Sequence, residues 1–189
     1  MELLKRLSTP ASILLTLLWL VPGVGEAQVY KTESGHAEFR SEVPLHSFTG
    51  TSDHLVGLIN LADSTVDFYI DLNTLDTGIN KRDRDMKETL ETDKFPFAEF
   101  FGKLVSDFDT SSSEPQNVTV KGEFGIHGIT RQVQIDGTLQ KTDRGLIVKA
   151  DWVIDIENYD IEPPGILFYR VEKEQDINIE ALLTPTEQG

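Results

Sequence analysis

Residues 117–139 read NVTVKGEFGIHGITRQVQIDGTL, and their pattern decides the fold. On either side of the turn-rich HGIT, apolar residues alternate with polar ones: Val118, Val120, Phe124, Ile126, Val133, Ile135 and Leu139. Successive side chains of a β-strand point to opposite faces, so this alternation is typical of strands with one buried face and one solvated face. The stretch therefore predicts half-buried antiparallel strands.

The same alternation recurs along most of the chain. It is clear in STVDFYIDL (64–72), GLIVKADWVIDIE (145–157) and DINIEALL (176–183), with turn-rich breaks such as LADS and KTDRG between the runs. The early segments HAEFRSEVP (36–44) and HLVGLINL (54–61) follow it less cleanly. About eight short strands separated by turns predict an all-β fold, either a sandwich or an up-and-down barrel.

Four glycines fall on the apolar phase of their strands, namely Gly57, Gly102, Gly122 and Gly137. A missing side chain leaves room on the inner face, or lets a sheet bend as it closes. Bending is the simpler explanation of any one glycine, but their joint placement favours a roomy barrel over a filled sandwich.

Residues 80–93, NKRDRDMKETLETD, lack strand alternation. Met86 and Leu90 are four residues apart and so share one face of a helix. Pro96 prevents that helix from continuing. We therefore expect one short helix around residues 81–92, mostly solvated, with a narrow apolar edge.

The strand after this helix carries phenylalanine on both faces. In residues 94–104, KFPFAEFFGKL, the apolar phase holds Phe100 and Leu104, whereas Phe97 and Phe101 share the opposite phase with charged residues. A strand with a polar outer face needs no apolar group there. We therefore expect the neighbouring helix edge to cover Phe97 and Phe101.

Residues 1–27 have the pattern of a secretory signal peptide. A basic start and a short apolar run at residues 13–21 precede small residues that suit cleavage after Ala27. The run is shorter than the roughly 20 residues that span a bilayer. We expect a cleaved signal peptide, one domain at residues 28–189, and a periplasmic or secreted protein. Because the chain has no cysteine, we expect no disulfide, no lipoprotein anchor and no stable membrane anchor.

The net charge of -15 argues against two classes of partner. Nucleic acid needs a basic face that neutralises phosphates, and an anionic membrane surface attracts basic segments. We therefore expect no nucleic-acid partner and no electrostatic binding to a membrane.

No motif points to catalysis or to a metal. The chain has no cysteine nucleophile, no nucleophile elbow and no phosphate-binding glycine loop. Its four histidines, His36, His46, His54 and His127, are too scattered for metal-ligand spacing. We expect no catalytic residue, no metal and no cofactor, apart from a bound isoprenoid or lipid if one is present.

Three stretches together are similar to a known family. They are the charged helix that runs into the Phe-Pro-Phe strand (residues 82–104), the opening stretch with its Ile-His-Gly-Ile-Thr turn (118–139), and, more weakly, residues 36–61. With these features the chain resembles the YceI-like family, the lipid- or polyisoprenoid-binding proteins. The resemblance covers nearly the whole chain after residue 27.

The resemblance implies an extended antiparallel, lipocalin-like β-barrel of about eight strands that holds an apolar chain. An isoprenoid quinone, a polyisoprenoid or a related lipid would be such a chain. The interior phase of the strands would line the cavity: Phe68, Ile70, Phe100, Leu104, Phe124, Ile126, Ile135, Trp152 and Ile154. Met86, Leu90 and Phe97 would lie at the cavity mouth.

Three functions stay open at this point. The first is an exported carrier or store of an apolar ligand, because burying such a chain gains about 0.8 kcal/mol per methylene group. The second is a structural or stress-related envelope protein whose barrel is filled by its own side chains and holds no ligand. The third is a hydrolase or isomerase that uses carboxylates at the barrel mouth. The sequence leaves the oligomeric state open, with a homodimer as one option.

Overall fold

The structure, a computed structural model, describes residues 29–43, 46–162 and 172–186. Eight antiparallel strands close into one barrel, in which each strand pairs with its sequence neighbours and β1 pairs with β8. The strands are β1 (Val29–Val43), β2 (His46–Asn60), β3 (Thr65–Asp71), β4 (Phe97–Leu104), β5 (Gln116–Ile126), β6 (Ile129–Thr142), β7 (Gly145–Asp155) and β8 (Glu174–Pro185). The predicted all-β barrel is confirmed, whereas the predicted signal peptide at residues 1–27 lies outside the described residues.

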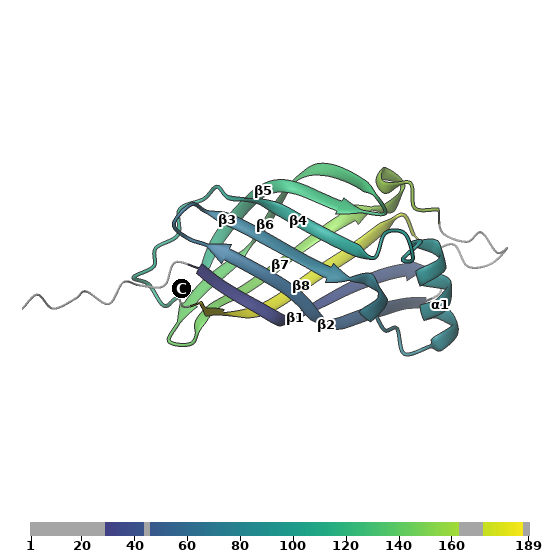
Figure 1. The fold of residues 1–189 in the computed structure, drawn as a ribbon, viewed down its shortest axis with the longest axis horizontal. Coiled ribbons are helices and arrows are strands. Elements are labelled where there is room, and N and C mark those ends of the chain that lie inside the picture. The colour runs from purple at the N-terminus through teal and green to yellow at the C-terminus, as the bar shows by residue number, and fades with distance from the viewer. Residues whose placement is uncertain (1–28, 44–45, 163–171, 187–189) are drawn as a thin grey trace, which may run out of the picture.

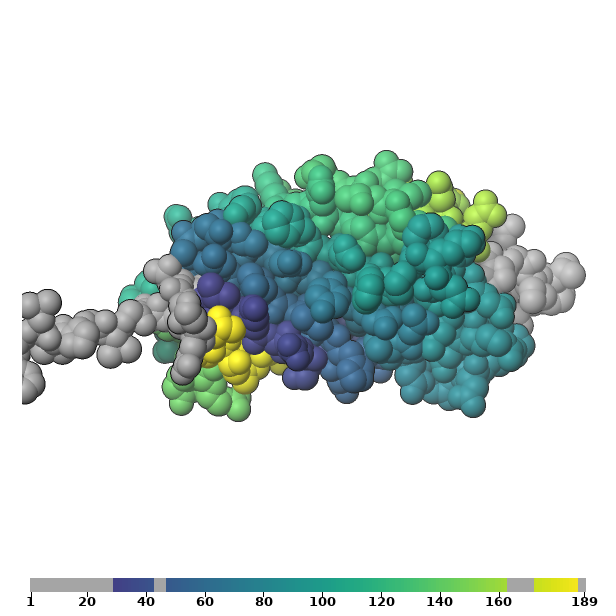
Figure 2. Space-filling model, viewed as in Figure 1, coloured from purple at the N-terminus to yellow at the C-terminus, as the bar shows by residue number. Residues whose placement is uncertain are grey.

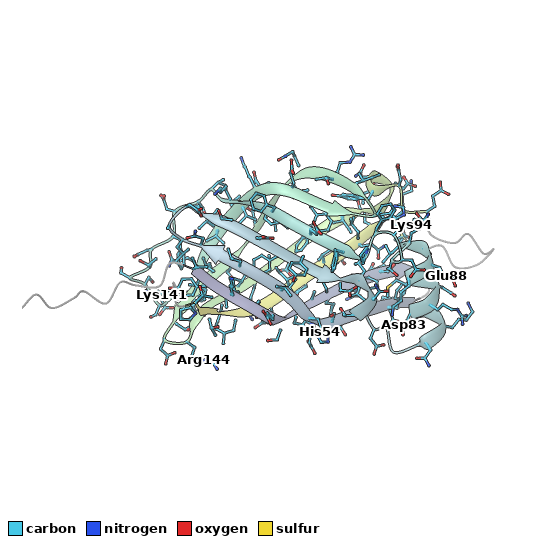
Figure 3. The ribbon with its side chains drawn as sticks, in the orientation of Figure 1. His54, Asp83, Glu88, Lys94, Lys141 and Arg144 are labelled. Carbon is cyan, nitrogen blue, oxygen red and sulfur yellow. The ribbon has the colours of Figure 1, made fainter. Side chains whose placement is uncertain are left out.

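The barrel is elongated and its two ends differ (Figure 1). The β3–β4 connection contains the 3-10 helix η1 (Leu72–Thr74) and the helix α1 (Asn80–Thr89), and the β7–β8 connection contains η2 (Ile156–Tyr159). These connections lie at one end, called the helix end below. The opposite end, called the far end, carries the β2–β3, β4–β5 and β6–β7 connections. Figure 3 shows Asp83 and Glu88 at the helix end and Lys141 and Arg144 at the far end.

The helix α1 forms in residues 80–93, where the sequence lacks strand alternation. It begins at Asn80 and ends at Thr89, and a turn follows to Lys94. The prediction of a short helix around residues 81–92 is thus confirmed, with an earlier end. In the space-filling view α1 packs onto the end of the barrel (Figure 2).

A β-bulge interrupts the period of two near the start of β1, at residues 32–37. The β1–β2 pairing shifts register between Thr32 and Gly35 and again between Gly35 and Ala37. On β1 the buried positions therefore change from even numbers at Thr32 to odd numbers at Gly35. An inserted residue of this kind moves every later side chain to the other face.

The glycines on the apolar phase do not leave open space. Gly102 and Gly122 are paired across β4 and β5, and a Cβ added to Gly122 would lie 2.5 Å from the Gly102 Cα. The ring of Phe68 fills the space at Gly57, where an added Cβ would lie 2.2 Å from a ring carbon. These glycines let backbones and aromatic rings approach closely as the sheet curves.

The outer face of β4 differs from the prediction. Phe97 and Phe101 are 41% and 57% exposed, so α1 does not cover them. Phe97 instead packs edge-on against Tyr69 of β3, with ring centroids 5.7 Å apart. The apolar edge of α1, which carries Met86 and Leu90, is turned toward the barrel interior and packs against the core.

Candidate functional site

The barrel encloses a cavity of about 680 Å³. Every strand contributes apolar side chains to its wall, for example Ala37, Leu55, Phe68, Phe100, Phe124, Ile135, Trp152 and Ile177 from β1 to β8 in order. The volume lies within the range of about 300–1,000 Å³ that is usual for small-molecule pockets. The cavity is therefore the candidate functional site.

The structure places all nine predicted lining residues along the cavity wall. They are Phe68, Ile70, Phe100, Leu104, Phe124, Ile126, Ile135, Trp152 and Ile154. Leu104 and Trp152 are half-buried and the others are buried. Their contact with a ligand stays a prediction.

Aromatic rings form a belt around the middle of the cavity. Phe100 pairs in register with Phe68 on one side and with Phe124 on the other. Phe124 also meets Trp152 and Tyr159 edge-on, with ring centroids 6.2 and 5.7 Å apart. Such edge-to-face pairs fix ring orientations, so the belt gives the wall a defined shape. Tyr159 does not line the cavity but packs against Phe124, and burial raises the pKa of its phenol.

The mouth of the cavity lies at the helix end. One stripe of α1 faces it with Arg82, Met86 and Leu90, and Leu72 and Leu75 come from the segment before the helix. Met86 and Leu90 thus line the cavity, and their role at its mouth stays a prediction. Phe97 does not line the cavity, because it occupies the outward phase of β4.

The far end of the interior is filled by side chains. Leu146 and Leu183 are 0% exposed and pair in register across β7 and β8. Tyr30 is buried at the same end, where burial raises the pKa of its phenol, and Leu139 borders the cavity. The interior thus has two parts, a filled core at the far end and an open cavity toward the helix end.

Polar groups are sparse in the cavity wall. Gln175 is buried, and its side-chain Nε2 donates to the carbonyl oxygens of Glu172 (2.6 Å) and Glu174 (3.0 Å). Within the described residues, the indole N–H of Trp152 is buried without a hydrogen-bond partner. A wall of this kind selects a ligand by shape and length more than by hydrogen bonds.

Two residues, Asp83 and His127, make polar contacts that hold the connections around the mouth. Asp83 of α1 accepts hydrogen bonds from the backbone N–H (2.9 Å) and the hydroxyl (2.6 Å) of Thr77, and these bonds lower the pKa of the Asp83 carboxyl. His127, in the β5–β6 turn, lies 3.0 Å from the carbonyl oxygen of Tyr159 and 3.4 Å from a carboxylate oxygen of Glu91. His127 thus connects the β5–β6 turn to η2 and to the turn that follows α1.

Within the described residues, no group of three or more His, Asp and Glu side chains is placed to hold a metal ion. In the same part of the chain, no helix is long and apolar enough to cross a membrane.

Sequence alternation missed several lining residues, among them Phe39, Phe48, Leu75 and Ile161. Phe39 and Phe48 lie in the strands that share the bulged pairing. Leu75 and Ile161 follow the ends of strands, where the period of two stops. The sequence signal available for them is only their apolar character beside a strand end.

Comparisons with known proteins agree with this geometry. A model of the YceI-like domain matches residues 30–183 of the chain. No curated protein matches the sequence.

Solved structures with the same fold include a polyisoprenoid-binding domain from Saccharophagus degradans that is implicated in plant cell wall breakdown. It has a TM-score of 0.69 and 16% sequence identity, and the match covers 85% of this chain and 100% of that one. Burkholderia cenocepacia BcnA is similar with a TM-score of 0.65 and 13% identity over 80% of this chain and 96% of its own. A Campylobacter jejuni YceI protein gives a TM-score of 0.60 and 13% identity over 78% and 90%. At these identities the likeness concerns the fold.

Proposed function

Because the chain belongs to the YceI-like family, we propose that it binds a long apolar chain, such as a polyisoprenoid, an isoprenoid quinone or a related lipid, inside its barrel. The observation that carries the proposal is the cavity of about 680 Å³, which is open toward the helix end and walled by aliphatic and aromatic side chains from every strand. A similar domain from Saccharophagus degradans is described as polyisoprenoid-binding.

The free energy of binding would come from removing the chain from water. Each methylene-sized group buried contributes about 0.8 kcal/mol, so a ligand of several prenyl units needs few polar contacts. The scarcity of polar groups in the wall fits this mode of binding. Such a protein would act as a carrier or store that shields the ligand from water.

We further propose that this carrier works outside the cytoplasm, in the periplasm or as a secreted protein. The support is the basic start, the apolar run and the small residues before Gln28 in the sequence. Protein purified from its own organism should begin at Gln28. Soluble cytoplasmic protein with an intact Met1 would contradict the export proposal without affecting the proposal of a ligand.

Trp152 provides a direct test of ligand binding, because it lines the cavity. Trp19 is the other tryptophan of the chain, so in a Trp19→Phe variant all indole fluorescence comes from Trp152. Delipidated Trp19→Phe protein is titrated with a prenylated quinone, whose ring quenches nearby indole fluorescence. We expect saturable quenching near one ligand per protein. Quenching that stays linear and unsaturated would contradict a specific site.

A further inference from the structure

We propose that Arg82 is a receptor for an anionic head group, and that the ligand is an amphiphile with a phosphate or carboxylate at one end of its apolar chain. This inference rests on the proposed function, since it concerns the same cavity. It specifies the chemical group at the end of the ligand that stays at the cavity mouth.

Arg82 lies on the same face of the helical segment as the apolar residues Met86 and Leu90. Arg82, Met86 and Leu90 follow one another at intervals of four residues and line the cavity together. Residues at this spacing lie on one face of a helix. Arg82 therefore faces the cavity mouth and lies beyond Met86 on the cavity-facing stripe.

Ion pairing distinguishes Arg82 from the other cations that line the cavity. Lys81 pairs with Asp85, and Lys149 pairs with Glu180 at 2.9 Å. Within the described part of the chain, Arg82 has no carboxylate at salt-bridge distance. The protein has a net charge of -15, yet this half-buried arginine at the mouth of an apolar cavity forms no salt bridge within the described residues. Its charge is therefore available to an anionic ligand.

The aromatic ring of Phe48 holds the guanidinium in place. The Arg82 Cζ lies 4.5 Å from the centroid of this ring, and Phe48 itself lines the cavity. A guanidinium stacked on a ring keeps its N–H groups at the edges, where they can donate to an anion. The contact therefore orients Arg82 and leaves its hydrogen-bonding capacity free.

The charge of Arg82 helps to lower the pKa of the adjacent Asp83 carboxyl, but the neighbouring carboxylates take their hydrogen bonds and salt bridges from other residues. Asp83 accepts hydrogen bonds from Thr77, and Asp85 pairs with Lys81.

An arginine discriminates between head groups by charge and geometry. A phosphate or carboxylate accepts two parallel N–H bonds from a guanidinium, whereas an alcohol accepts one uncharged bond. An anionic prenyl compound should therefore bind more tightly than the corresponding alcohol.

The test compares three probes with the same chain: geranylgeranyl phosphate, geranylgeranoic acid and geranylgeraniol. Each is titrated into delipidated full-length protein at 0.15 M salt, where the Debye length is about 8 Å and the field of distant surface charges is largely screened. The variants are Arg82→Met and, as the matched control, Arg84→Met. Arg84 lies on the same helix, is exposed, does not line the cavity, and is near Asp85 and Glu88.

We expect the unaltered protein to bind at least one anionic probe about tenfold more tightly than geranylgeraniol, because a hydrogen bond to a charged group contributes roughly 1.5 kcal/mol or more. Arg82→Met should remove this preference while geranylgeraniol still binds, and Arg84→Met should keep it. The phosphate and carboxylate arms show which anion is preferred.

Equal binding of all three probes by the unaltered protein would overturn the role of Arg82 and leave the apolar cavity intact. So would an equal loss of preference in both variants, since that result would reflect net charge alone. Failure of every probe, including geranylgeraniol, would overturn the proposed function and this inference with it.

Discussion

Gly102 and Gly122 face each other in register across β4 and β5, so closely that neither has room for a side chain. A Cβ added to Gly122 would lie 2.3 Å from the carbonyl oxygen of Phe101 and 2.5 Å from the Gly102 Cα. Both atoms belong to the backbone and cannot rotate away. The barrel thus curves sharply here, beside the aromatic belt that forms the middle of the cavity wall.

Gly122→Ala should destabilise the protein clearly. The added methyl group forces the two strands apart, and overpacking of this kind costs about 1–3 kcal/mol or more. The measurement is the free energy of unfolding in urea. Gly125→Ala is the matched control on the same strand, because its added Cβ would meet nothing nearer than a side-chain hydroxyl at 3.3 Å. Equal effects of the two substitutions would contradict the close backbone approach.

Neighbouring phenylalanines on β4 should respond very differently to truncation. Phe100 is 7% exposed and lines the cavity, whereas Phe101 is 57% exposed on the outer face. Phe100→Ala should cost about 3 kcal/mol, at the lower end of the range for buried phenylalanine, because the cavity already leaves one side unpacked. Phe101→Ala should cost less than about 1 kcal/mol. A reversed order in thermal or urea unfolding would show that the strand faces are misassigned.

The strand phases from β3 onward could be predicted because nothing interrupts their period of two. From β3 to β8 the apolar phase of the sequence is the inner phase of the barrel, as at Phe68, Phe124 and Ile154. β1 and β2 resisted prediction because a bulge reverses the inner phase along the strand. Amino-acid composition gives no clear sign of a bulge, because a bulge depends on how two strands pair.

The mouth was harder to predict than the wall. Strand alternation put Phe97 on the outward phase of β4, but the predicted place of Phe97 at the cavity mouth did not follow that phase. Helical spacing put Met86 and Leu90 on one face, but it could not show that Arg82 also lines the cavity. The direction of Arg82 depends on how the connection after β3 docks on the barrel end. That docking is fixed by contacts between distant residues, such as the hydrogen bonds of Asp83 to Thr77.

Filling the open part of the barrel should abolish binding without unfolding the protein. Ala98 of β4 lines the cavity, so in Ala98→Leu the larger side chain enters free space. Prenyl-chain binding should fall at least about tenfold, while stability changes by less than about 1 kcal/mol. Fluorescence titration and urea unfolding measure the two effects.

Ala181→Leu is the matched control for this substitution. Ala181 is buried on β8, does not line the cavity, and lies close to Gly35. The larger side chain should overpack this site and destabilise the protein by about 1–3 kcal/mol. If Ala98→Leu destabilises as much as Ala181→Leu, the interior at Ala98 is a filled core.

The hydrogen bonds from Thr77 to Asp83 predict a pH-dependent contribution to stability. The bond from the Thr77 hydroxyl is the main cause of a lowered pKa at Asp83 in the folded protein. A lowered carboxyl pKa adds stability above the ordinary value of about 3.9, and this contribution is lost as the pH falls through the lowered value. The loss in free energy of unfolding caused by Asp83→Asn should therefore be present at pH 7 and shrink in strong acid. A loss that is the same at both pH values would contradict a role for the charge.

The proposed function requires that the open part of the barrel holds an apolar chain. The most direct measurement extracts protein purified from its own organism with organic solvent and identifies the extract by mass spectrometry. We predict a prenyl or acyl lipid near one molecule per protein, and its absence from an Ala98→Leu variant purified in the same way. An extract without lipid, from a protein that also takes up no added prenyl chain, would contradict the claim.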